Sequence, residues 1–67
     1  MNISHRDLEA GRCVEVCHDD RLLGYAIFFA GGWDAYVVTP GMHLRRVLGN
    51  TESKNEAILM VKREAMA

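Results

Sequence analysis

The sequence predicts a single small α+β domain, residues 1–67, in which an antiparallel meander of three to four short strands is closed by a C-terminal helix packed on one face. Three observations support this class. Apolar, β-branched and aromatic segments alternate with glycine, proline and aspartate turn signals. A serine–glutamate capping box precedes the last amphipathic segment, and 67 residues leave room for one core only.

The N-terminal segment carries a weaker capping pattern. Ser4 is followed three residues later by the acidic Asp7, and Gly11 is placed to end a helical turn. We therefore expect a short N-terminal helical turn near residues 5–10.

The middle of the chain predicts the strands. The segment 12–18 is rich in valine, and the aspartate pair after it supplies turn chemistry. The most secure element is a hairpin of residues 22–30 and 33–38 joined by the two-residue turn Gly31-Gly32. A fourth strand over 42–48 follows the Thr39-Pro40-Gly41 break, and its proline makes it the weaker edge.

The C-terminal helix is predicted over residues 54–66. Ser53 is its N-cap, and Glu56 stands at the position from which a capping box reaches back to the cap. A helical period places one apolar stripe toward the sheet: Ala57, Ile58, Val61 and Ala65, with Met60 at its margin.

Strand alternation then assigns the sheet faces. With Gly31-Gly32 as the whole turn, Phe29 opposes Asp34 and Ile27 opposes Tyr36. The expected core face comprises Val14, Val16, Leu23, Tyr25, Ile27, Phe29, Asp34, Tyr36, Val38, Met42, Leu44 and Leu48. The expected outer face comprises Cys13, Glu15, Cys17, Leu22, Gly24, Ala26, Phe28, Ala30, Trp33, Ala35, Val37, His43, Arg45 and Val47. A register shift of one residue would exchange the two faces.

The expected outer face is too apolar to be solvent surface alone, and one helix covers one face only. Either the N-terminal turn covers it through Leu8, or a second copy of the chain meets it through the small-residue stretch Gly24, Ala26, Ala30 and Ala35. A monomer with a half-apolar outer face is the remaining alternative. We expect a homodimer, because a thin core gains from a partner and two-fold dimers are the commonest assembly.

The cysteine and histidine residues do not predict a metal or catalytic site. Four residues of strand separate Cys13 and Cys17 by roughly 13 Å, beyond the roughly 7 Å that a disulfide spans, so both are expected to be reduced packing residues. Neighbours Cys17 and His18 point to opposite faces of a strand, and no second cysteine pair completes a zinc set. We expect no metal, no cofactor and no enzymatic activity.

The net charge and the lack of targeting features limit the classes of partner that we expect. Eight basic against nine acidic residues give a net charge of −1, which favours a protein partner over nucleic acid. No apolar run approaches the 18 residues of a membrane span and no signal-peptide core is present, so we expect a cytoplasmic protein that does not bind membranes.

The sequence thus favours a non-enzymatic protein-interaction module that self-associates through the outer sheet face or an edge strand. The alternative is a nucleic-acid-binding accessory domain that stacks bases on a sheet bearing aromatic and arginine side chains. Either function would use the candidate partner-binding residues Phe28, Trp33, His43, Arg45 and Arg46.

The order of strands, capping box and final helix resembles the three-stranded sheet plus helix of arm-type DNA-binding domains of phage integrases, and also double-stranded-RNA-binding-like folds. The resemblance concerns the order of elements, and no functional residue is inferred from it.

Overall fold

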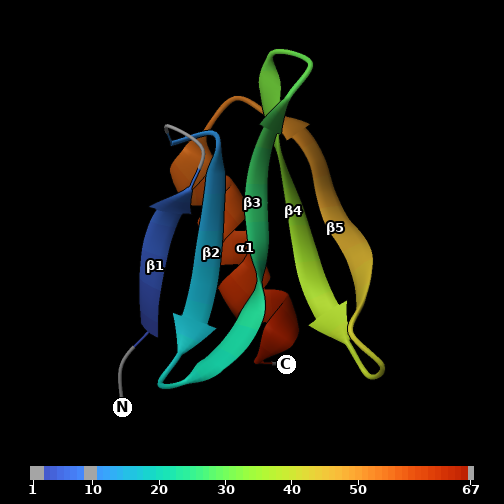
Figure 1. The fold of residues 1–67 in the computed structure, drawn as a ribbon. Helices are drawn as coiled ribbons and strands as arrows, with labels where there is room; N and C mark the ends of the chain where they lie inside the picture. The colour runs from blue at the N-terminus through green and yellow to red at the C-terminus, as the bar shows by residue number, and fades with distance from the viewer. Residues whose placement is uncertain (1–2, 9–10, 67) are drawn as a thin grey trace.

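The computed structural model describes residues 3–8 and 11–66. They form five strands, β1 (Ile3–Leu8), β2 (Cys13–His18), β3 (Arg21–Phe29), β4 (Gly32–Thr39) and β5 (His43–Thr51), followed by the helix α1 (Lys54–Ala65). The strands make one antiparallel sheet in the order β1-β2-β3-β4-β5, and α1 crosses behind it (Figure 1). The predicted α+β meander with a C-terminal helix is confirmed.

The helical turn predicted near residues 5–10 is not observed. Ile3–Leu8 is strand β1, paired with β2 from Ile3–His18 to Leu8–Cys13, and residues 9 and 10 lie outside the described residues. An isolated short helix is costly to nucleate, whereas a strand gains a ladder of backbone hydrogen bonds along β2. Tertiary pairing therefore overrides the local capping pattern.

The β3–β4 hairpin forms as predicted, with its turn one residue earlier. Ala30 and Gly31 are the two turn residues, with φ of 55° and 80°, as a type I′ turn requires. Phe29 consequently pairs with Gly32 and Ile27 with Asp34, two positions away from the expected register. A shift of two residues leaves the face of every strand residue unchanged.

A β-bulge in β3 decides which face is buried. Val16 pairs with Gly24 and Cys17 with Leu22, so Leu23 is the extra residue. The bulge moves Val14 and Val16 onto the side of Gly24 and Ala26 instead of Tyr25. The predicted partition of the two faces is therefore wrong.

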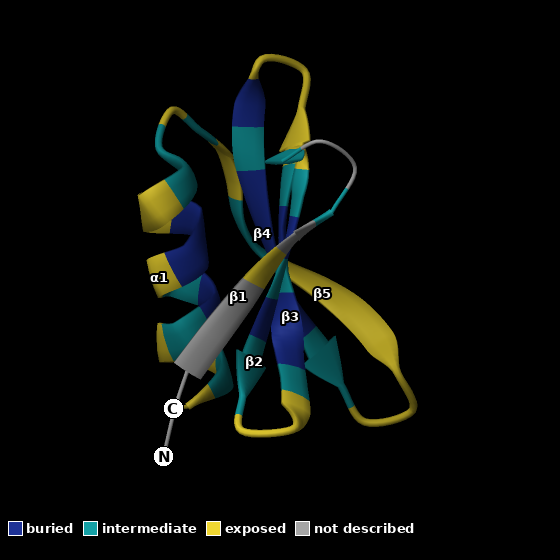
Figure 2. Cartoon of the chain, turned by 60° about the vertical axis from the view of Figure 1, so that its left-hand side comes forward, coloured by how far each residue is buried: buried dark blue, intermediate teal, exposed yellow. Residues whose placement is uncertain are grey.

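The core lies between α1 and a sheet face that combines residues of both expected faces: Val14, Val16 and Leu23 of the expected core face with Ala26, Ala35 and Val37 of the expected outer face. It consists of Val14, Val16, Leu23, Ala26, Ala35, Val37, Ala57, Ile58 and Val61. Three of these come from the predicted apolar stripe of the helix, which is confirmed. The buried stretches of β3 and β4 turn toward the buried side of α1, and the exposed side of the helix turns outward (Figure 2).

The small residues of β3 and β4 explain why the helix takes this side. Gly24, Ala26 and Ala35 are buried and present little or no side chain, so α1 can approach the backbone closely. These three residues were predicted to contact a second copy of the chain, but they pack against α1 instead. Ala30 belongs to the exposed hairpin tip.

The helix begins where the sequence predicts. The Ser53 hydroxyl accepts a hydrogen bond from the backbone N–H of Glu56 at 3.1 Å, as expected for an N-cap. The Glu56 carboxylate accepts from the Thr51 hydroxyl at 3.0 Å, which fixes the end of β5 to the first turn of α1.

A buried carboxylate connects β4 to β5 within the irregular part of their pairing. The register of β4 and β5 shifts between Trp33 and Tyr36, where the regular ladder is interrupted. Asp34 is buried there and accepts a 2.7 Å hydrogen bond from the backbone N–H of Asn50. This bond satisfies a donor that the interrupted ladder leaves behind.

Candidate interaction surface

The sheet face turned away from α1 is the candidate interaction surface. No described element lies over it, and Figure 1 views the molecule from this side. We call it the open face, and the strand registers define it as Arg6, Leu8, Cys13, Glu15, Cys17, Leu22, Tyr25, Ile27, Phe29, Asp34, Tyr36, Val38, Leu44 and Arg46, of which Asp34 is buried.

One row of the open face crosses all five strands. The register pairs Arg6 with Glu15, Glu15 with Tyr25, Tyr25 with Tyr36, and Tyr36 with Arg46. Two tyrosines thus occupy the centre of the sheet, flanked by an acidic residue on one side and an arginine on the other. Cross-strand neighbours on one face lie about 4.5–5.5 Å apart at Cβ, so the row is a continuous polar and aromatic stripe.

The stripe is charged at both edges. Arg6 Nη2 lies 3.1 Å from Glu15 Oε1, and the Glu15 side chain is 22% exposed. Arg46 is exposed at the opposite edge, beside Tyr36. The Arg6 side chain of this pair is 72% exposed, so its charge is available to a partner.

Large apolar side chains surround the stripe. Phe29 is 70% exposed, Leu44 is 50% exposed, and Ile27 and Val38 are half-buried. The core, by contrast, has valines as its largest fully buried side chains. The open face therefore carries large apolar side chains that no described element covers, which is typical of an interaction surface.

The five predicted partner-binding residues do not form one surface. Phe28 and Trp33 lie on the helix side, where their ring centroids are 5.4 Å apart and Trp33 packs against the core. The ammonium of Lys54, in the first turn of α1, lies 5.9 Å from the Trp33 ring centroid. Through these contacts the two aromatic rings cover one end of the core.

The other three predicted residues are on β5. His43 and Arg45 point to the helix side, and Arg45 Nη2 lies 4.0 Å from Glu64 Oε1 in an exposed pair. Arg46 alone projects from the open face. Their predicted role in binding stays a prediction, but only Arg46 lies on the open face.

Sequence reasoning missed Tyr25 and Tyr36 as site residues because it placed them in the core. The signal that identifies them is the run of glycine and alanine on the alternate positions, Gly24, Ala26 and Ala35. A helix needs small residues beneath it, so the larger residues of the same strands face away.

The cysteines are unbridged, and both point to the open face from β2. Among the described residues, no three His, Cys, Asp or Glu side chains gather as a metal ion would require. Within the same residues, no helix has the length and hydropathy to cross a membrane.

Comparisons with protein-family models, with curated proteins and with solved structures found no match to this chain.

Proposed function

We propose that this domain is a non-enzymatic protein-interaction module that forms a homodimer by packing its open face against that of a second copy. The observation that carries the proposal is the uncovered sheet face with Tyr25 and Tyr36 at its centre and Ile27, Phe29 and Leu44 around them. A sheet face of this composition is ordinarily buried against another layer.

The size of the face suits a second copy. The Cα atoms extend over 31 × 20 × 18 Å, so the broad side of the molecule covers on the order of 600 Å², and side chains bring it toward the roughly 800 Å² per partner of a standard interface. Two sheets that pack face to face lie about 10 Å apart with their strands nearly aligned, which leaves room for both tyrosine rows to interdigitate.

The charges of the face are self-complementary. A two-fold axis parallel to the strands sets the β1–β2 edge of one copy over the β4–β5 edge of the other. Arg46 of the partner copy then lies over the Arg6–Glu15 pair, whose carboxylate offers the arginine an acceptor, and Glu15 lies over the partner's Tyr36. A net charge of −1 also adds little repulsion between copies.

The test is the mass in solution at micromolar concentration by light scattering after size exclusion. We expect twice the 7.5 kDa of the monomer. Ile27→Glu places an unpaired charge in the interface and should weaken dimerisation at least about 50-fold. The matched control is Leu59→Glu on the outer side of α1, where Leu59 is 52% exposed, and it should dimerise like the wild type.

Two results would overturn this proposal: a monomeric wild type, or an Ile27→Glu dimer as tight as the wild-type dimer. Circular dichroism shows whether the variant retains its fold. Phe29→Ser offers a second disruption at a position that is 70% exposed, so the monomer should lose almost no stability while the dimer dissociates.

The aligned row Tyr25–Tyr36–Arg46 also favours a second candidate function, the binding of single-stranded nucleic acid. Bases would stack on the two tyrosines, and Arg46 would contact phosphate, with each stack worth about 1–3 kcal/mol. The carboxylate of Glu15, in the same row, would repel the phosphates of a nucleic acid, which is why we place this candidate second.

Fluorescence anisotropy with a labelled twelve-nucleotide RNA at 50 mM and 200 mM salt tests the second candidate. If it holds, Tyr36→Ala weakens binding about tenfold at both salt concentrations, and Arg46→Gln reduces the dependence of the affinity on salt. An anisotropy that does not rise at 50 mM salt would remove nucleic acid and leave the dimer proposal intact.

The state of the two cysteines fits a reducing compartment. Cys13 and Cys17 are not bridged by a disulfide, and oxidising compartments favour bridged cysteines in domains this small. We therefore place the proposed module in the cytoplasm.

A further inference from the structure

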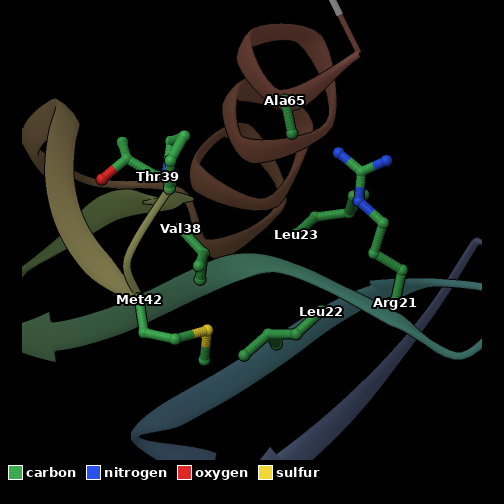
Figure 3. Close-up of a pocket in the computed structure, with 8 residues that line it drawn as sticks. Arg21, Leu22, Leu23, Val38, Thr39, Met42 and Ala65 are labelled. Carbon is green, nitrogen blue, oxygen red and sulfur yellow. The ribbon is translucent and has the colours of Figure 1, made fainter.

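A pocket of about 500 Å³ lies at the end of the sheet where β3 begins and β4 ends. Its walls include Leu22 and Leu23 of β3, Val38 of β4, Met42 of the following turn and Ala65 of the last helical turn. Figure 3 shows Leu22 and Met42 on one side of the β3 ribbon and Leu23 and Ala65 on the other. Pockets for small molecules have volumes of about 300–1,000 Å³, so this one is large enough for a ligand.

The β-bulge at Leu23 creates the pocket. The pairing of β3 with β4 runs from Phe29–Gly32 to Gly24–Val37 and stops there, although both strands continue. The bulge turns the first residues of β3 toward β2, and Figure 1 shows β3 and β4 diverging below this point in front of the C-terminal end of α1. The pocket is thus a consequence of the sheet geometry, closed on one side by the turn between β4 and β5.

The pocket walls are apolar with one cation. Among its described lining residues, Arg21 carries the only charge, and the structure gives its guanidinium no ion-pair partner among the described side chains. Figure 3 shows this guanidinium beside Leu23, directed toward the last turn of α1. Thr39, the other polar lining side chain, already donates to the His43 carbonyl at 3.1 Å.

We propose that this pocket binds a small amphipathic carboxylate, an alkyl or aryl chain that ends in one carboxylate group. The chain lies against Leu23 and Ala65, on the side of β3 where the Arg21 guanidinium lies, and the carboxylate accepts hydrogen bonds from Arg21. Guanidinium is the side chain best matched to a carboxylate, because it donates two parallel hydrogen bonds.

The probe is decanoate below its micellar concentration, compared with the neutral decan-1-ol of the same chain length. Two-dimensional NMR of the labelled protein should show saturable shifts at the amides of Leu22, Leu23, Val38 and Thr39. Decanoate should bind at least about tenfold more tightly than decanol, which is the contribution of one charge-assisted hydrogen bond.

Arg21→Gln should weaken decanoate binding at least about tenfold and leave decanol binding within twofold of the wild type. Arg63→Gln, which removes an exposed arginine from α1, is the matched control and should change neither affinity. Equal affinities of the wild type for decanoate and decanol would overturn the proposal, as would unsaturable shifts or an Arg21→Gln variant that binds decanoate normally.

The pocket proposal does not rest on self-association. Ile27 pairs with Asp34 in the other half of the β3–β4 hairpin, away from the pocket. The Ile27→Glu variant should therefore still bind decanoate with saturable shifts. Its affinity is compared with that of the wild type at concentrations below dimerisation, because Val38 lies both in the pocket wall and on the open face.

Discussion

Gly24→Ala is expected to unfold the domain. A Cβ at position 24 would overlap the Tyr36 carbonyl oxygen and come within 2.9 Å of Val37 Cα. Both are backbone atoms of the neighbouring strand, so relief requires β4 to move away from β3 and to disturb the core at Ala35 and Val37. We expect a loss of about 3 kcal/mol or more, which is most of the stability of a domain of this size.

Urea unfolding followed by circular dichroism measures the effect, with Gly31→Ala as the matched control. A Cβ at position 31 meets nothing within 4 Å, but its φ of +80° strains an L-residue. The control should lose only about 1 kcal/mol. A Gly24→Ala variant as stable as Gly31→Ala would show that the two strands do not approach as closely as the structure indicates.

Trp33→Ala has the second largest expected effect, a loss of about 3 kcal/mol in the free energy of unfolding. Trp33 is half-buried, packs against the core and contacts Phe28 with ring centroids 5.4 Å apart. Truncation would leave a cavity between β4 and the first turn of α1 and would remove the contact with Lys54. If Trp33 instead served only a partner, its removal would leave the fold intact.

Circular dichroism is the appropriate measurement, because the variant lacks the single tryptophan. Trp33→Phe should restore part of the lost stability, since an aromatic ring still fills the site. Leu59→Ala is the control for a large exposed apolar residue and should change the free energy by less than about 0.5 kcal/mol. A Trp33→Ala variant no less stable than Leu59→Ala would contradict the position of the ring over the core.

The elements that the sequence predicts correctly are those that local chemistry determines. The capping serine, the apolar stripe of α1 and the glycine-rich hairpin act within a few residues, and all three appear in the structure. Strand β1 was missed because Ser4 and Asp7 favour a helical turn when they are considered alone. Its pairing with the neighbouring strand β2 overrides that preference, and no two-residue turn signal marks this hairpin in the sequence.

The candidate site was harder to predict for a different reason. A single inserted residue, Leu23, reverses the side of the sheet on which Val14 and Val16 lie, and alternation patterns do not reveal such an insertion. Phe28 and Trp33 were consequently placed outside, and Tyr25 and Tyr36 inside. The glycine and alanine residues beneath the helix carried the missing information.

The bulge at Leu23 also has an evolutionary consequence. Because the identity of the outward face depends on one extra residue in β3, deletion of that residue would restore simple alternation with β2. The valines of β2 would then turn away from the helix while the rest of the sheet kept its orientation. A one-residue deletion at this point would therefore cost the domain the core contacts of Val14 and Val16, whereas a substitution on the open face would leave them in place.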